Sequence, residues 1–309
     1  MFMKRAVNCG LVKADNMKQA ILLLSFGTPR QPSDLLPYLT SIRRGKIPTE
    51  RELKVLTARY DAIGQWDNKL LQTMGEEQKK TLTSLLAIDA MYLAYLHMPN
   101  SMEQAIESIA TAGYTSILCI VTSPFYSMIG TGAYERKLHS ILRAYPDISC
   151  EIIKSWWNRP QFFEYWRSQL MAANPLQADT ACIFSAHSVP TSTVGSYEDE
   201  VMSASNQIAK MVGLNHWYQA WQSAAPYGEW LGPTIESVIE QALIDGAKRI
   251  VCIPFGFVSD HVEILYDNDM ICRNIVENAG ATYERLPMPN GNTLFMEAMA
   301  KAIRERINK

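Results

Sequence analysis

The sequence predicts an α/β protein built from two doubly wound lobes with parallel sheets and a cleft between them. Three observations predict this fold. Short apolar runs alternate with amphipathic stretches, a helix–glycine–strand unit occurs twice at a constant spacing, and 48% of the 309 residues are apolar. That apolar share supplies a sizeable core, and at roughly 150 residues per domain the length fits one large or two medium domains.

Continuous apolar, β-branched runs predict eight strands. The predicted strands are residues 20–26, 90–96, 117–123, 150–154, 181–186, 216–220, 250–255 and 281–285. Because continuous apolar strands bounded by helices are typical of parallel sheets covered on both faces, we expect helices on both sides of each sheet.

Amphipathic stretches between these runs predict ten helices. The predicted helices are residues 33–43, 49–62, 69–86, 101–113, 132–144, 160–173, 198–213, 233–246, 262–279 and 291–307. Gly113 and Gly246 each stand at the end of a predicted helix, where glycine adopts the left-handed conformation without a Cβ penalty.

The helix–glycine–strand unit repeats at an offset of 133 residues. Residues 101–125 and 234–258 keep helix, glycine and strand in register. A second similarity joins AILLLSFGTP (20–29) to ACIFSAHSVP (181–190), each a strand that ends in a tight turn with proline. Duplicated lobes explain both similarities, while the alternative is that all α/β units look alike at this level.

The repeat also predicts the domain boundaries. We expect a tail at residues 1–18, a first lobe at 19–155 and a second lobe at 156–309. The first sixteen residues carry cations and lack the apolar h-region of a secretory signal.

Charge and cysteine usage exclude several classes of protein. Lys and Arg number 29 against 31 for Asp and Glu, so the formal charge is −2 and a strongly basic nucleic-acid footprint is excluded. No apolar run approaches the ~20 residues that span a bilayer, so we expect no transmembrane segment, while peripheral membrane contact stays open. The six cysteines include no CxxC pair, which predicts no disulfide framework and a reducing, cytoplasmic location.

Candidate functional residues follow the predicted strands, because doubly wound sheets bind ligands beyond the carboxyl ends of their strands. Neither GxGxxG nor GxxxxGK[ST] follows a strand, so a nucleotide fingerprint is absent. His187 stands one residue past a predicted strand, in the turn SAHSVP. That position favours a functional histidine, and the alternative is a capping or packing histidine.

A row of carboxylates follows the predicted strand at residues 250–255. If a helix begins near Asp260, then Asp260, Glu263 and Asp267 fall on neighbouring turns of one face. Glu263 and Asp267 are like charges four residues apart, so the row suggests a cation, a proton relay or an exposed face. The alternative is a capping box, with Asp260 as N-cap and Glu263 as its third residue. His261 is a further candidate.

Cations and aromatic residues indicate the kind of ligand. Arg43, Arg44 and Lys46 end a predicted helix, where the macrodipole stabilises cations; alternatively, they bind carboxylates, which arginine forks match. Aromatic residues near strand ends can wall a flat apolar ligand, although core packing explains most of them. They are Phe125, Tyr126, Trp156, Trp157, Trp221, Tyr227 and Trp230. Together these residues predict a large, partly apolar, anionic ligand.

Five motifs, in order, resemble the ferrochelatase family. They are LLSFGTP (23–29), RYDAIG (59–64), FSAHSVP (184–190), WQS…WLGP (221–233) and PFGFVSDHVEILYDND (254–269). The resemblance runs from about residue 19 to residue 307. It implies two Rossmann-like lobes with a porphyrin in the cleft, and insertion of Fe²⁺ as a late step of haem biosynthesis. Fe²⁺ is then a substrate, and no cofactor is required.

The family's catalytic histidine and glutamate fall on His187 and Glu263, which we also expect to be the metal ligands. Metallation must remove two pyrrole protons and deliver desolvated Fe²⁺. An imidazole can accept a proton or ligate iron, and carboxylates can relay protons or strip water from the metal. The site should also bend the porphyrin ring to expose its lone pairs. We expect Phe26 to face His187 across the cleft.

The resemblance extends to substrate contacts. They are Phe26, Arg43, Arg44, Phe125, Tyr126, Tyr134, Arg136 and Trp230. SIRRGK (41–46) and SMIGTGAYERKL (127–138) are similar to bacterial members that metallate coproporphyrin III, whose four propionates arginines can meet. NGNTLF (290–295) is similar to protoporphyrin IX-using members as well.

Three alternatives to a coproporphyrin III enzyme stay open. They are a protoporphyrin IX ferrochelatase, a cobalt chelatase of the same superfamily, and a non-enzymatic two-lobed tetrapyrrole-binding protein. The cobalt enzyme should be richer in histidine than this chain, which has five. We expect a monomer that binds the porphyrin and Fe²⁺ without nucleic acid.

The chain also departs from the family's pattern. Relatives often have tyrosine at Phe26, histidine at Phe125 and a carboxylate at Ile271, and the last change argues against a peripheral metal site at Asp267. They usually read GG-x-SP where this chain reads Gly64-Gln65-Trp66-Asp67-Asn68.

Overall fold

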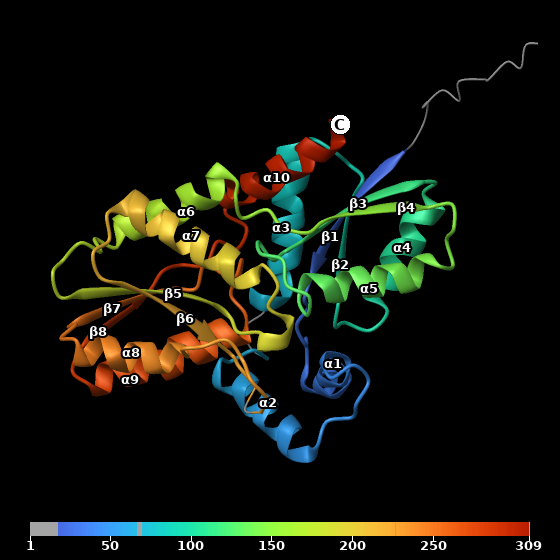
Figure 1. The fold of residues 1–309 in the computed structure, drawn as a ribbon. Helices are drawn as coiled ribbons and strands as arrows, with labels where there is room; N and C mark the ends of the chain where they lie inside the picture. Colours follow the sequence, from blue (N-terminus) through green and yellow to red (C-terminus); the bar gives the residue numbers. More distant parts are fainter. Residues whose placement is uncertain (1–17, 67–69, 226, 309) are drawn as a thin grey trace, which may run out of the picture.

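The computed structural model describes residues 18–66, 70–225 and 227–308. Its two lobes lie side by side, each built on one sheet (Figure 1). The predicted tail, apart from its last residue, lies outside the described residues, as do Asp67 and Asn68 of the altered loop.

Eight strands occur in the described residues, and every neighbouring pair is parallel. The first sheet holds β1 (Gln19–Ser25), β2 (Met91–Tyr95), β3 (Ser116–Val121) and β4 (Ser149–Ile153); the second holds β5 (Thr180–His187), β6 (Trp217–Gln222), β7 (Arg249–Ile253) and β8 (Thr282–Arg285). The strand orders are β2-β1-β3-β4 and β6-β5-β7-β8, which is the same order twice. The predicted α/β class with two doubly wound lobes is thus confirmed.

The helices connect successive strands, except for the C-terminal helix, which follows the last strand. Within the described residues they are α1 (Leu35–Ile42), α2 (Glu50–Ala62), α3 (Leu70–Leu86), α4 (Ser101–Thr111), α5 (Thr131–Leu142), α6 (Pro160–Ala172), α7 (Tyr197–Val212), α8 (Ile235–Ile244), α9 (Arg273–Asn278) and α10 (Thr293–Ile307). Short 3₁₀ turns occur at Pro32–Asp34 and Thr191–Thr193. The predicted helix at 262–279 differs in kind, because a π-helix at Ile264–Cys272 precedes α9.

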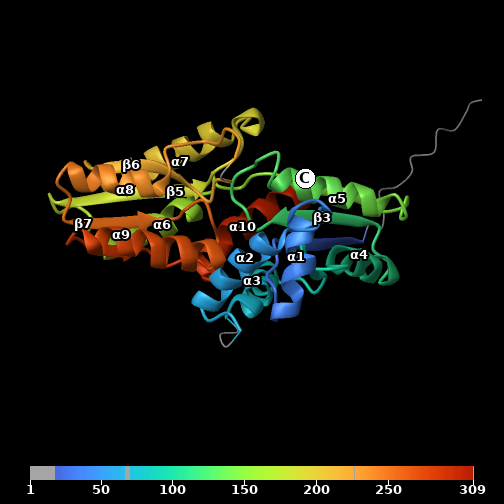
Figure 2. The ribbon, with the colours of Figure 1, turned by 90° about the horizontal axis from the view of Figure 1, so that it is seen from below.

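Helices cover both faces of each sheet, as the two views show (Figures 1 and 2). One face of the first sheet packs on α4 and α5 through a cluster that includes Leu22 and Ile106. One face of the second sheet packs on α8 and α9 through a cluster that includes Ile183 and Ile239. Burial of both faces explains the continuously apolar strands.

The other two sheet faces contribute to one shared core. A single cluster of buried apolar side chains joins Leu82 of α3, Phe295 of α10 and Phe162 of α6. Helix α10 packs on both α3 and α6, and Arg304 of α10 donates to the carbonyl oxygen of Leu85 at 2.7 Å. The C-terminal helix therefore ties the lobes together, and a boundary at residue 155 stays a prediction.

No helix in the described part of the chain combines the length and the apolarity that crossing a bilayer requires.

Candidate functional site

The candidate site lies at the carboxyl ends of the second sheet's strands, where the first lobe meets the π-helix. His187 is the last residue of β5. Arg59 of α2 approaches the π-helix from the first lobe: its Nη1 lies 3.6 Å from Asp267 Oδ1, and its guanidinium lies 5.1 Å from the centre of the Tyr266 ring. Side chains from both lobes therefore converge beside the edge where doubly wound sheets bind ligands.

His187 and Glu263 form an ion pair at this edge. The two residues lie 3.6 Å apart, measured from His187 Nε2 to Glu263 Oε1. His187 Nδ1 lies 2.5 Å from the Ser188 carbonyl oxygen. Because a carbonyl oxygen accepts and cannot donate, Nδ1 carries a proton and Nε2 is the nitrogen that faces Glu263. The structure thus brings together the two residues that the sequence predicts as catalytic.

The ion pair shifts both pKa values. Burial alone would lower the pKa of His187, but the Glu263 carboxylate, together with the Ser188 carbonyl and Asp267, raises it to about 9. Burial would likewise raise the pKa of Glu263, but His187, with smaller contributions from His261 and Arg59, lowers it to about 2. Near neutral pH the free site therefore holds an imidazolium beside a carboxylate.

Asp267 is a second carboxylate next to this pair. Its Oδ2 accepts a hydrogen bond from Ser223 Oγ at 2.9 Å, and its other oxygen faces Arg59. Burial and the neighbouring charge of Glu263 raise the pKa of Asp267 to about 6, although Arg59 and Ser223 oppose the shift. Asp267 can therefore exchange a proton near neutral pH more readily than Glu263.

The capping-box alternative for the acidic row is wrong. Histidine, not aspartate, caps the helix: His261 Nδ1 accepts from the backbone N–H of Ile264 at 3.3 Å. Asp260 is held instead by Asn290, whose Nδ2 donates to Asp260 Oδ2 at 2.8 Å. Burial lowers the pKa of His261, so its ring stays neutral and can accept this bond.

Phe26 is 46% exposed at the carboxyl end of β1, and its contact with a ligand stays a prediction. Its ring packs edge-on against His97, with ring centres 4.4 Å apart, and His97 Nδ1 lies 2.9 Å from Ser41 Oγ. Burial lowers the pKa of His97 to about 4, so this imidazole is neutral. His97 follows β2, and the strand-end rule applied to β2 is the signal that could have found it. That Phe26 faces His187 stays a prediction.

The predicted cations have different surroundings. Arg43 pairs with Glu52, the residue that also closes the N-terminal capping box of α2. Arg44 has a left-handed backbone, with φ of 57°, and an exposed side chain. Arg136 is exposed and donates to the carbonyl oxygen of Met128 at 3.1 Å. Arg44 and Arg136 are thus accessible to propionates, whereas the Arg43 charge is already partnered.

Tyr126 and Trp230 are half-buried near strand ends. Trp230 pairs with Pro190 in an isolated antiparallel bridge, and its Nε1 donates to the Tyr227 carbonyl oxygen at 2.8 Å. The bridge anchors the Trp230 segment to the turn that follows His187. The side chain of Tyr126 lies near Lys154, whose Nζ is 5.5 Å from the ring centre.

Phe125 and Tyr134 differ from the expectation that they contact the ligand. Phe125 is 1% exposed and stacks on Trp157, with the edge of Phe255 against it. Tyr134 is 4% exposed in the cluster beneath α4 and α5. Both side chains are apolar core in this structure, because the segments that follow β3 are covered by helices of both lobes.

Sequence reasoning missed three residues of the first lobe. Arg59 and Tyr60 lie in the motif RYDAIG, to which no role was assigned, and Tyr38 lies in α1. Tyr38 and Tyr60 are almost fully buried. Burial raises both pKa values, and the charge of Glu263 contributes to each shift, so these phenols stay neutral beside the acidic row. The resemblance of RYDAIG to a family motif is the signal that could have found two of them.

In the part of the chain that the structure describes, no three His, Cys, Asp or Glu side chains converge as a ready-made metal site. His187 and Glu263 nevertheless offer one nitrogen and one oxygen donor on neighbouring segments. Such a pair suits transient passage of a cation better than permanent storage.

Over nearly its whole length the chain is similar to proteins of one family. The family model described as Ferrochelatase matches residues 18–307. The coproporphyrin III ferrochelatase of Geobacillus kaustophilus (strain HTA426) is 33% identical over 302 residues, covering 93% of this chain and 95% of that protein. The enzyme of the same name from Staphylococcus aureus (strain Mu50) is 31% identical over 303 residues, covering 93% of this chain and 98% of that protein.

Solved structures show the same fold at low sequence identity. The sirohydrochlorin chelatase SirB from Bacillus subtilis subspecies spizizenii, in complex with cobalt, superposes with a TM-score of 0.63 at 10% identity, covering 94% of this chain and 95% of that chain. CbiX, described as the terminal enzyme of sirohaem biosynthesis in denitrifying bacteria, gives a TM-score of 0.54 at 13% identity, covering 93% of this chain and 98% of that one. These likenesses concern the two-lobed fold alone.

Proposed function

Because this chain belongs to the ferrochelatase family and is a metal chelatase, we propose that it inserts Fe²⁺ into coproporphyrin III during haem biosynthesis. The observation that carries the proposal is the pairing of His187 with Glu263 at the edge where the two lobes meet. Insertion replaces two pyrrole protons with one Fe²⁺, so the site must accept two protons for each ring that it metallates.

His187 Nε2 is the group that receives the first pyrrole proton. It can do so after the imidazolium of the free site has passed its own proton onward, because a protonated imidazole has no lone pair. Glu263 is the adjacent acceptor, and Asp267, whose pKa of about 6 suits exchange near neutral pH, is the next carboxylate along the chain. Protons then leave from His187 through Glu263 toward Asp267.

His187 Nε2 must also lose its proton before it can bind the metal, because a protonated nitrogen has no lone pair to donate. His187 and Glu263 place an imidazole nitrogen and a carboxylate oxygen 3.6 Å apart, which lets both atoms contact one cation at ordinary bond lengths of about 2.1 Å. Each donor replaces a water molecule of the incoming Fe²⁺. The pair also favours an enzyme over a pure tetrapyrrole carrier, which needs apolar walls and no acid–base pair.

Coproporphyrin III is the proposed ring for two reasons. The curated relatives from Geobacillus and Staphylococcus bear that substrate in their names. The exposed guanidinium groups of Arg44 and Arg136 can pair with propionates, and this ring carries four. Such charge-assisted contacts gain strength where the bound ring excludes water from them, and contribute little where they stay exposed.

An anaerobic insertion assay tests the proposal. The purified chain is mixed with Fe²⁺ and either coproporphyrin III or protoporphyrin IX, and the absorbance of the free and metallated rings is followed. We expect a higher kcat/KM for coproporphyrin III, no insertion by His187→Ala, and porphyrin binding by that variant within a few fold of the unmodified chain.

Two results would overturn parts of the proposal. A higher kcat/KM for protoporphyrin IX refutes the assigned ring and leaves the metallation chemistry intact. Near-normal turnover by His187→Ala refutes the assigned role of the His187–Glu263 pair.

A further inference from the structure

Three consecutive side chains of the π-helix are each held by a different partner. Asp267 accepts a hydrogen bond from Ser223, in the loop after β6. Asn268 Nδ2 donates to Gln222 Oε1 of β6 at 3.1 Å. Asp269 contacts Arg285 at the end of β8. Neighbouring side chains on a helix point in different directions, so these contacts fix the rotation of the helix about its axis. Of these partners, Arg285 also contacts a second residue of the same segment, Asp260.

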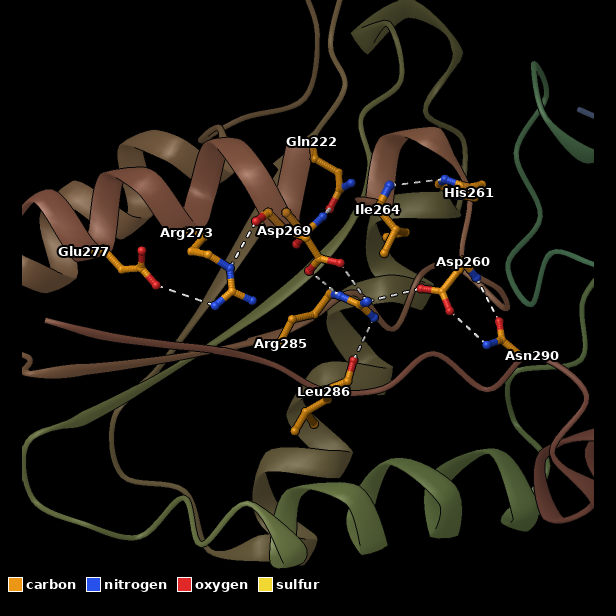
Figure 3. Close-up of polar contacts among 11 residues, drawn as sticks. Gln222, Asp260, His261, Ile264, Asp269, Arg273, Glu277, Arg285, Leu286 and Asn290 are labelled. Carbon is orange, nitrogen blue, oxygen red and sulfur yellow. Dashed lines mark hydrogen bonds and ion pairs between the residues drawn. The ribbon is translucent and has the colours of Figure 1, made fainter. Parts of the chain in front are cut away.

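Arg285 joins two aspartates that flank the catalytic segment (Figure 3). Its Nε lies 2.6 Å from Asp269 Oδ1 and its Nη2 lies 2.8 Å from Asp269 Oδ2, a bidentate pair. The same Nη2 lies 3.2 Å from Asp260 Oδ1. Asn290 completes the arrangement, because its side chain accepts from the Asp260 backbone N–H at 2.9 Å and donates to the Asp260 carboxylate.

Asp260 and Asp269 stand on either side of Glu263 in the chain. Asp260 lies three residues before Glu263, and Asp269 lies six residues after it. Between them lies His261, whose Nδ1 accepts from the backbone N–H of Ile264. A single guanidinium therefore holds the chain both before and after the carboxylate that faces His187.

We propose that Arg285 is a positioning residue for metal insertion, because its hold on Asp260 and Asp269 sets where the Glu263 carboxylate lies relative to His187. Its role in insertion rests on the proposed function; its hold on the segment does not. Arg285 contacts no reacting atom and acts through Glu263.

The chemistry of the contact favours arginine over any other cation. The side chains of Arg285 and Asp260 are 14% and 12% exposed, so water screens their charges weakly. The rigid guanidinium fork grips both oxygens of Asp269 while one nitrogen still reaches Asp260. A lysine ammonium is a point charge on a flexible stem, which keeps the charge and loses the two-sided geometry.

Arg285→Lys and Asp269→Asn test the proposal in the full-length chain. At a temperature well below the midpoint of thermal unfolding, we expect each variant to lower kcat with coproporphyrin III and Fe²⁺ about tenfold or more, since displacement of a catalytic group by an ångström can cost a hundredfold. The KM for coproporphyrin III should stay within about twofold. Amide hydrogen exchange should accelerate over residues 260–272 and stay unchanged in the first lobe.

Arg249→Lys is the matched control. Arg249 is 18% exposed, pairs with Glu284 on the same strand as Arg285, and donates to the Ala173 carbonyl oxygen at 2.6 Å, away from the acidic row. This variant should lose about as much thermal stability as Arg285→Lys. Its kcat and the amide hydrogen exchange of residues 260–272 should stay at the level of the unmodified chain.

The outcomes separate this proposal from the proposed function. Three results would overturn the positioning role. The first is unchanged kcat in both test variants, the second is a rise in porphyrin KM that accounts for the whole loss of activity, and the third is the same loss of kcat in Arg249→Lys. If Arg285→Lys does not fold, Asp269→Asn decides by the same measurements. An unmodified chain that inserts no metal contradicts the proposed function, and unchanged exchange over residues 260–272 still refutes the hold of Arg285 on this segment.

Discussion

Replacing Glu263 by glutamine should move the pH at which metal insertion begins. Glu263 is the main group that raises the pKa of His187 to about 9, against the opposing effect of burial. Glutamine keeps the shape of the side chain and removes the charge. Burial is then the largest remaining influence and is opposed only by the smaller effects of the Ser188 carbonyl and Asp267, so the pKa of His187 should fall below 6.5, the ordinary value for histidine.

The size of the effect follows from these values. With a pKa of about 9, roughly 1% of His187 is neutral at pH 7, whereas with a pKa below 6.5 more than about three quarters is neutral. The acidic limb of kcat/KM should therefore shift down by more than about two pH units in Glu263→Gln. The plateau itself should fall about 10²-fold or more, because the variant also loses an acid–base group.

The assay is kcat/KM for anaerobic iron insertion between about pH 5.5 and pH 10, with the proton signal of the His187 ring followed in parallel by NMR. Glu297→Gln is a suitable control, because Glu297 is 29% exposed, compared with 30% for Glu263, and pairs with Arg304 on α10. The control should keep the acidic limb of the unmodified chain. If the acidic limb of Glu263→Gln lay at the same pH as that of the unmodified chain, the inference that Glu263 sets the protonation of His187 would be refuted.

The same pKa values predict how the ion pair contributes to folding stability. The pKa of His187 is raised above its unfolded value of about 6.5, so its contribution is complete below that pH and is lost as pH rises through about 9. The pKa of Glu263 is lowered, so its contribution is complete above about pH 4.5 and is lost as pH falls through about 2. The difference in unfolding free energy between the unmodified chain and Glu263→Gln should peak between about pH 4.5 and pH 6.5.

Three further substitutions give expected outcomes. Asp267→Asn should lower kcat less than Glu263→Gln, because Asp267 stands one step further from His187; a larger loss would reverse this order. Phe26→Tyr should create a phenolate-to-iron charge-transfer band with ferric coprohaem and tighten its binding, since Phe26 is exposed and has no lone pair; an unchanged spectrum means that Phe26 does not face the iron. Gly256→Ala should destabilise the protein by about 1–3 kcal/mol in denaturant unfolding, because an added Cβ would lie 2.4 Å from Ala186 Cβ; unchanged stability would show that β5 can move aside.

Much of the fold was predictable because its signals are local and periodic. A strand buried on both faces must be apolar at every position, so the runs around Leu22 and Ile183 identify central strands without any knowledge of their neighbours. The π-helix was not predictable in this way. It depends on contacts of Asn268 and Asp269 with strands β6 and β8, and the pattern of side chains along 262–279 is that of an ordinary helix.

The candidate site was predictable where function follows strand ends and was missed where it depends on pairing between distant segments. His187 ends β5 and Glu263 follows β7, and the strand-end rule places both at one edge. Arg59 joins this edge through a contact with Asp267 that no sequence spacing reveals, because the two residues belong to different lobes.

Aromatic and basic residues show a second limit of prediction from sequence. The type of a residue does not reveal which side chain it contacts in the folded protein. Phe26 and Phe125 both follow strands of the first sheet, yet one is 46% exposed and the other is 1% exposed. The difference arises after each strand. The Phe26 ring packs edge-on against His97, whereas the Phe125 ring is enclosed by Trp157 and Phe255 from segments beyond the first sheet. Arg43 likewise ends a helix in a position suited to a propionate, but Glu52 of the following helix already accepts its charge. A propionate that binds Arg43 must therefore displace a carboxylate already in place, so the net gain from that contact is smaller than from the exposed Arg44.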